Sequence, residues 1–231
     1  MIFVLLIIFM AYNRFSSGYF NFREWLYSTL LLLPAIVIGL TFHEFAHAYS
    51  AYKLGDYTPK AQNRVTLNPL SHIDPVGIAV LILAGFGWGR PVQVNPLAFK
   101  GNKRRAGFIV SIAGVAMNFV IAFICAAFVI IIETHAAYSV QMNALHSILV
   151  SVVYINIVLM FFNLLPIPPL DGFGIITELF DLRRYSWHRM FYDYGMFILL
   201  ALLIFGFISK ILMPAVAVVL QFIYSFWFFV I

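Results

Sequence analysis

Residues 30–47 read LLLLPAIVIGLTFHEFAH, and they lie within an apolar stretch that runs from Trp25 to Tyr52. If this stretch is helical, His43 and His47 lie on one face, about 6 Å apart along the axis. That spacing suits two of the three protein ligands of a catalytic zinc, with Glu44 as the general base. Because the residues before the motif are typical of a membrane helix, the sequence predicts this chemistry inside a bilayer.

The composition supports a membrane protein independently of the motif. Of the 231 residues, 63% are apolar and only 10% are charged, and the mean hydropathy is +0.97. A soluble domain of this length could not cover such a surface with polar groups. The single cysteine, Cys125, cannot form an intramolecular disulfide. The net charge of +5 informs the membrane topology and does not indicate a nucleic-acid partner.

The pattern predicts an all-α polytopic membrane protein with about six transmembrane helices, a re-entrant segment and a small strand-like edge. The expected spans are Met1–Ala11, Trp25–Leu54, Gly107–Ile132, Ser147–Leu165, Phe191–Ile208 and Ile211–Ile231. The first could instead be an interfacial helix, and no cleaved signal peptide is expected there. We expect one domain over residues 1–231, with a core at 25–184 and C-terminal spans at 191–231.

Two segments between the second and third spans are expected to approach the membrane without crossing it. The apolar run Val76–Gly87 has only about a dozen residues, which is too short for a span and suits a re-entrant segment. The segment Trp88–Asn95 has an extended, proline-bounded character typical of a strand or loop edge. Pro91–Asn95 could capture an unwound substrate backbone by β-addition, with Val92 and Val94 facing one side.

The distribution of basic residues predicts the orientation. Eight Lys and Arg residues lie between the end of the second span, at Lys53, and Gly107, and three more lie between Leu165 and the span at Phe191–Ile208. The connection Glu133–His146 has none. By the positive-inside rule the basic groups face the cytoplasm, although Arg14 and Arg23 are a mild exception. We therefore expect a multi-pass cell-membrane protein whose histidine motif lies toward the cytoplasmic side.

A zinc held by two histidines needs a third protein ligand and keeps one position open for water. Asp171 is the best candidate, because intramembrane carboxylates are costly and tend to mark function. It follows a triple-proline segment that cannot continue a regular helix, at the same predicted depth as the two histidines. An open alternative is that Asp171 caps a helix over Gly172–Phe180.

The sequence resembles the site-2 protease family of intramembrane zinc metalloproteases. The segment FHEFAH at 42–47 matches the family's His-Glu-x-x-His helix, and NLLPIPPLDG at 163–172 matches its second signature. LNPLSHIDP at 67–75 and GWGRPVQVNP at 87–96 are similar to the compact bacterial subgroup that lacks PDZ and CBS domains. The resemblance covers roughly Trp25 to Arg184. One departure is GVAMN at 114–118, where the family often has Gly-Pro-x-x-Asn.

The resemblance implies a role for each matching residue. His43, His47 and Asp171 would bind one zinc per chain, and Glu44 would activate the water that attacks a peptide bond. Asn163 would help hold the unwound substrate backbone. The implied activity is hydrolysis of peptide bonds in or near transmembrane segments of membrane protein substrates, which is regulated intramembrane proteolysis.

Three alternatives stay open at this point. Intramembrane histidines and carboxylates also mark ion paths, so the chain could be a metal-binding transporter or channel. Asn163 could only bridge two helices by a polar contact. His72 and Asp74 could supply a rival metal ligand, or they could belong to a solvated turn. The substrate, the trigger for cleavage and the oligomeric state cannot be read from the residues.

Overall fold

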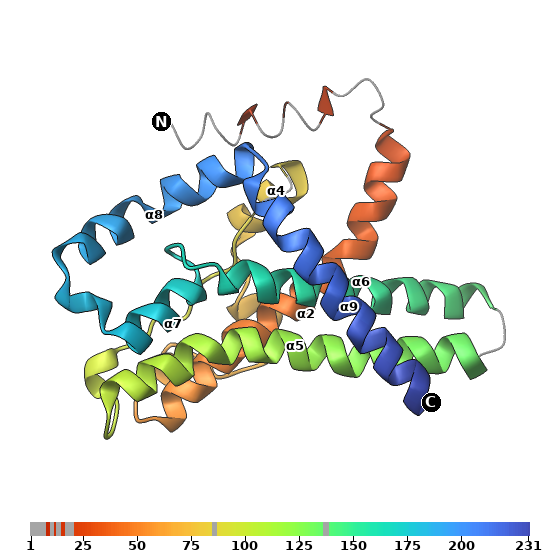
Figure 1. The fold of residues 1–231 in the computed structure, drawn as a ribbon. Coiled ribbons are helices and arrows are strands. Elements are labelled where there is room, and N and C mark those ends of the chain that lie inside the picture. The colour runs from red at the N-terminus through yellow and green to blue at the C-terminus, as the bar shows by residue number, and fades with distance from the viewer. Residues whose placement is uncertain (1–7, 10–11, 13–14, 17–20, 85–86, 136–138) are drawn as a thin grey trace.

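A computed structural model describes residues 8–9, 12, 15–16, 21–84, 87–135 and 139–231 (Figure 1). Four of its helices are long and apolar enough to cross a membrane: α2 (Phe22–Lys53), α5 (Lys103–His135), α6 (Val140–Leu164) and α9 (Phe207–Val230). The other α-helices are α3 (Thr58–Ala61), α4 (Pro75–Ala84), α7 (Asp171–Phe180) and α8 (Ser186–Ile204). Three short 3₁₀ turns lie at Pro69–Ser71, Pro96–Ala98 and Leu182–Arg184. The prediction of an all-helical membrane protein is confirmed over the described residues.

The predicted count of six spans is not confirmed. The apolar runs that predicted the second, third, fourth and last spans form α2, α5, α6 and α9. The span expected at Phe191–Ile208 corresponds to α8, which already ends at Ile204 because Gly206 adopts a left-handed conformation, with φ of 69°. α8 is not among the four helices that are long and apolar enough to cross a membrane, and its first half contains polar residues such as His188, Arg189 and Asp193. Most of Met1–Ala11 lies outside the described residues.

Close packing of α2, α5 and α6 builds the part of the fold that holds the polar residues. α2 packs against both α5 and α6, and these two also pack against each other. Small buried residues make the approach possible, as is usual for helices in a bilayer. On α2 they are Ala35, Gly39, Ala46, Ala48 and Ala51. A Cβ atom on Gly39 would lie only 2.7 Å from Leu159 Cδ1 of α6.

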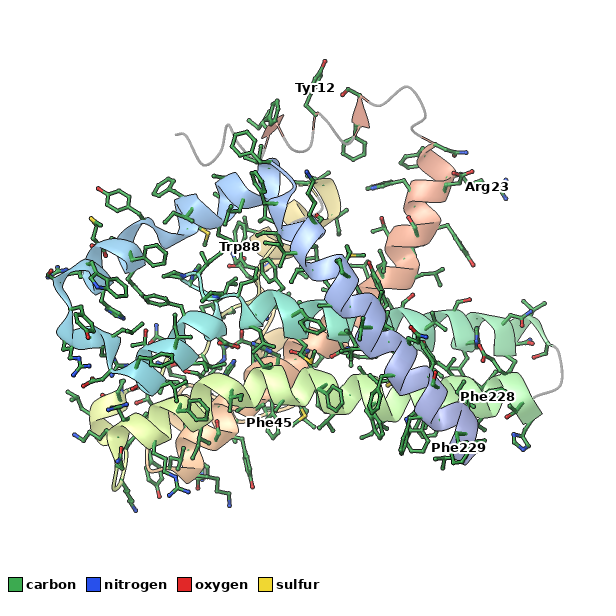
Figure 2. All side chains as sticks on the ribbon, viewed as in Figure 1. Tyr12, Arg23, Phe45, Trp88, Phe228 and Phe229 are labelled. Atoms are coloured by element: carbon green, nitrogen blue, oxygen red, sulfur yellow. The ribbon has the colours of Figure 1, made fainter. Side chains whose placement is uncertain are left out.

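The C-terminal helix α9 crosses α5 and α6 on the side visible in Figure 1. A fully buried apolar cluster joins the three helices, and it includes Ala122, Ile157 and Ile223. Large apolar side chains remain exposed along the outer faces. Figure 2 shows Phe228 and Phe229 projecting from the end of α9, where they are 73% and 91% exposed. This outward distribution of large apolar side chains suits a lipid environment.

No paired strand forms at Pro91–Asn95, so the predicted strand-like edge is not confirmed over the described residues. Among the described residues the only β-type pairing is an isolated bridge between Ile73 and Gly89. Two backbone N–H groups of the segment are instead held by carboxylates. Asn95 N–H donates to Asp56 Oδ2 at 2.6 Å, and Val92 N–H donates to Glu44 Oε2 at 2.9 Å. While these two N–H groups bind carboxylates, they are not available to a strand ladder within this chain.

Candidate metal centre

The structure brings together the three residues predicted to bind metal. His43 and His47 lie one turn apart on α2, and Asp171 is the first residue of α7. The two histidine Nε2 atoms are 3.0 Å apart. Each of them lies 3.1 Å from Asp171 Oδ2. Both imidazoles are buried, so three potential ligand atoms converge in a site with little access to solvent.

The break between α6 and α7 delivers Asp171 to the histidines. α6 ends at Leu164, and the proline-rich residues that follow turn the chain back before α7 begins. Gly172 is required for the tight return, because a Cβ atom there would lie 2.2 Å from Leu164 O. The capping position of α7 is Leu170 and not Asp171. The capping alternative is therefore not supported, since the Asp171 carboxylate contacts the two imidazoles instead.

The hydrogen bonds of the two imidazoles direct both Nε2 atoms into the site. His47 Nδ1 lies 2.7 Å from Val110 O, which can only accept, so His47 Nδ1 carries the proton. His43 Nδ1 donates in the same way to Asn118 Oδ1 at 2.6 Å. Two unprotonated Nε2 atoms 3.0 Å apart repel each other unless a cation lies between them. Two neutral imidazoles and one carboxylate are the donor set of many catalytic zinc sites, so these residues fit zinc.

Gly114 of α5 makes room for this cluster. A Cβ atom at this position would lie 2.4 Å from His47 Nε2 and 2.6 Å from His43 Cε1. Real Cβ atoms do not approach other atoms this closely. The absence of a side chain at Gly114 therefore lets α5 lie directly against both imidazoles.

Glu44 lies beside the cluster and is held from two directions. Its Oε2 atom accepts the hydrogen bond from Val92 N–H and lies 4.0 Å from Arg64 Nη2. Arg64 is itself only 4% exposed and donates to the carbonyl of Arg90. Burial lowers the pKa of the Arg64 guanidinium, and the Glu44 carboxylate opposes that shift. Glu44 therefore faces a cation and a backbone donor on the side of the 87–95 segment.

A cavity of about 340 Å³ joins the cluster to the residues predicted to bind substrate. Its walls include Asn163, Val92 and Val94 together with Glu44. Gln93 points elsewhere and accepts a hydrogen bond from Gln62 Nε2 at 2.9 Å. Asn163 donates from Nδ2 to Leu159 O within α6. A larger hollow of about 900 Å³ lies at the other end of α5 and holds none of the predicted site residues.

The rival ligands His72 and Asp74 lie outside this cluster. His72 Nε2 is 2.8 Å from Thr66 O, and burial lowers the pKa of its imidazole. Asp74 caps the start of α4 through Val76 N–H and Gly77 N–H, and it accepts from Trp88 Nε1. Among the described residues, only His43, His47 and Asp171 form a group that could hold a metal ion. Both rival residues thus have structural partners of their own.

Comparison with known proteins identifies the family. The chain is 42% identical over 202 residues to YwhC of Bacillus subtilis, which is named for a zinc metalloprotease activity, and the match covers 83% of this chain and 90% of YwhC. The family model of Peptidase family M50 matches residues 129–206. This chain belongs to that family. Rip2 of Mycolicibacterium smegmatis, also named for a zinc metalloprotease activity, is 32% identical over 150 residues, covering 64% of this chain and 56% of Rip2. No solved structure matches.

Membership of the M50 family establishes this chain as a zinc metalloprotease of the site-2 type, which acts within the membrane. The transporter alternative is thereby disfavoured. The family model includes Asn163 and Asp171 but not the histidine motif, so the ligand roles of His43 and His47 stay predictions.

Sequence reasoning assigned no role in the site to three residues around this M50 centre. Asn118 and Asn156 are fully buried polar residues in apolar helices, and Arg64 is a buried cation beside Glu44. The signal for the two asparagines was available, since polar side chains within membrane helices are costly and tend to mark function. Arg64 gave no comparable signal, because it was counted only as one of many basic residues in a loop.

Proposed function

We propose that this M50 peptidase holds its zinc with His43, His47 and Asp171 and uses Glu44 as the general base. The proposal rests on the triangle of three ligand atoms, whose sides measure 3.0–3.1 Å. The three ligand residues line the same cavity as Glu44. In a tetrahedral zinc site the ligand atoms lie about 2.0–2.2 Å from the metal, and the distances between them are only slightly longer than the sides of this triangle. Zinc bound there supplies an acidified water molecule and a Lewis acid for the scissile carbonyl.

Glu44 has the geometry to move protons in this reaction. Its carboxylate lines the ligand cavity and accepts one hydrogen bond, from Val92 N–H. In the proposed cycle a Glu44 oxygen takes a proton from the attacking water and later gives it to the leaving amine. Arg64 Nη2 lies 4.0 Å from Glu44 Oε2 and places a positive charge beside this carboxylate. Throughout the cycle, His43 and His47 stay protonated at Nδ1 and donate hydrogen bonds to Asn118 Oδ1 and Val110 O, respectively.

We propose that the cavity beside Val92 and Val94 receives the unwound backbone of a membrane-protein substrate. A transmembrane helix hides its peptide groups in internal hydrogen bonds, so it must unwind before attack. Val92 N–H, which now binds Glu44, is a backbone donor that a substrate carbonyl could use instead. Asn163 lines the same cavity and is the proposed second polar contact to the substrate.

The proposed setting is the cell membrane, with the site toward the cytoplasm. Support comes from the basic residues of the α2–α5 connection and from the lack of Lys and Arg at Glu133–His146. The ten apolar residues of α4 are too few to cross a bilayer and support a re-entrant segment. The further spans at Met1–Ala11 and Phe191–Ile208, and a single domain over the whole chain, stay predictions.

Metal removal tests the proposed ligand set. The purified protein is stripped with a chelator, and cleavage of a labelled single-span substrate in detergent is followed while zinc is restored. We expect cleavage to return with about one zinc per chain. A His47→Ala protein should neither bind zinc nor recover activity. Equal recovery by both proteins would refute the ligand assignment.

A further inference from the structure

We infer that Asn118 and Asn156 form a positioning relay that fixes the tautomer of His43 and hence the atom it offers to zinc. The inference rests on the metal centre proposed above. Asn118 belongs to α5 and Asn156 to α6, whereas His43 belongs to α2. Both asparagines are 0% exposed. Burying two amides among membrane helices costs free energy unless both the NH₂ group and the oxygen of each amide form hydrogen bonds, so their presence there points to a function.

Each hydrogen bond of the relay is donated away from the metal site, from His43 to Asn118 and from Asn118 to Asn156 on α6. Asn156 Nδ2 donates to Val152 O at 2.9 Å. Asn156 Oδ1 then accepts from Asn118 Nδ2, also at 2.9 Å. Asn118 Oδ1 in turn accepts from His43 Nδ1 at 2.6 Å. A second donation, from Asn118 Nδ2 to Gly39 O at 3.3 Å, ties the same amide to α2.

Backbone carbonyls set this direction, because a carbonyl oxygen can only accept. Val152 O requires the NH₂ group of Asn156 on its side, which turns Asn156 Oδ1 toward Asn118. Asn118 must therefore turn its NH₂ group toward Asn156 Oδ1, and Gly39 O needs a donor on the same side. Only the Oδ1 atom of Asn118 then faces His43, so His43 Nδ1 must carry a proton. The unprotonated Nε2 is left for the metal.

The two histidines differ in how their tautomers are secured. His47 Nδ1 donates directly to Val110 O, a backbone carbonyl that cannot be reversed by rotation of a side chain. His43 depends on an amide whose two ends are nearly equal in shape. A flipped Asn118 would present NH₂ to His43 Nδ1 and favour a proton on Nε2, the wrong tautomer for a metal ligand. The relay prevents that flip, since the flipped oxygen would face Asn156 Oδ1 and Gly39 O.

Zinc affinity and histidine tautomer can both be measured without an activity assay. The variants are Asn118→Leu, Asn156→Leu and the double variant, which keep similar side-chain volume. Thr41→Val is the matched control, because Thr41 is buried on the same helix as His43 and its Oγ1 has no hydrogen-bond partner among the described residues. Zinc dissociation constants are obtained by chelator competition. The ¹⁵N signals of labelled histidine are recorded on metal-free protein at alkaline pH, with His43→Ala identifying the His43 signal.

We expect Asn118→Leu to weaken zinc binding by about 10- to 100-fold, the usual cost of losing the hydrogen-bond partner of a metal-bound histidine. Asn156→Leu should lie between wild type and Asn118→Leu, because Gly39 O still orients Asn118. The double variant should match Asn118→Leu, since Asn156 acts only through Asn118. In the single variants part of the His43 population should carry its proton on Nε2. Thr41→Val should change neither quantity.

Different failures have different meanings. A wild-type protein that binds no zinc would refute the proposed metal centre itself. Zinc binding with unchanged affinity and an unchanged His43 signal in the variants would refute the relay alone. Additive losses in the double variant would also refute it, because they would indicate independent packing effects. Should Asn118→Leu fail to fold, an unchanged His43 signal in Asn156→Leu is sufficient to overturn the inference.

Discussion

Gly114→Ala tests how closely α5 lies against the metal centre. The added Cβ atom would be 2.4 Å from His47 Nε2 and 2.6 Å from His43 Cε1. Ordinary contacts need about 3.5 Å, so the imidazoles or the helices would have to separate by roughly 1 Å. Metal–ligand distances tolerate a deviation of only about 0.2 Å. One added methyl group should therefore remove at least one histidine from the ligand set.

The expected loss can be bounded from below. Losing only an outer hydrogen-bond partner typically lowers metal affinity by about 10- to 100-fold. Displacing a ligand itself should cost Gly114→Ala at least about 100-fold in zinc affinity. The assay is chelator competition on protein purified in detergent, with the thermal midpoint of the metal-free protein as a measure of folding. Ala116→Val is the control, because Ala116 is exposed on the same helix and should tolerate the larger side chain. Wild-type affinity in Gly114→Ala would refute the close approach of α5.

Three further outcomes are expected. Asp171→Ala should purify with far less zinc than wild type, since two histidines alone do not make a catalytic set, and full occupancy by elemental analysis would exclude Asp171 as the third ligand. Val94→Pro removes one backbone N–H beside the cavity, so the cleavage rate should fall while the zinc content and thermal midpoint change little; an unchanged rate would make the segment a mere connector. Ile157→Ala truncates a fully buried side chain and should lower the free energy of unfolding by about 2–5 kcal/mol, measured by denaturant titration in detergent, with a loss below 1 kcal/mol contradicting the packing of α5, α6 and α9.

The sequence was sufficient to predict the elements that hold the site. Long apolar runs identify α2, α5 and α6, because a membrane helix must satisfy its peptide groups internally and face lipid. The meeting of the histidine motif with Asp171 was also predictable. Both were expected at the same membrane depth, and few other carboxylates were available in apolar surroundings. The predicted third ligand needed no knowledge of how the helices pack.

Other features depend on contacts that no local pattern encodes. The sequence predicted the break between the last two spans at 209–210, whereas α8 ends at Ile204 and α9 begins at Phe207, on either side of the left-handed Gly206. The 87–95 segment has the composition of an edge strand, but Glu44 and Asp56 bind its N–H groups from distant parts of the chain. The hydrogen bond between His43 and Asn118 joins residues 75 positions apart. It follows from the way α5 packs on α2, which hydropathy does not specify.

The central claim is that one cluster binds the metal while Glu44 performs the proton transfer. Glu44→Gln separates these two roles, because the amide preserves the size of the side chain but cannot accept a proton from water. The direct measurement compares cleavage of a single-span substrate, together with zinc content, for purified wild-type and Glu44→Gln protein. We predict that the variant retains about one zinc per chain and loses cleavage. Cleavage at the wild-type rate by zinc-loaded Glu44→Gln protein would contradict the account.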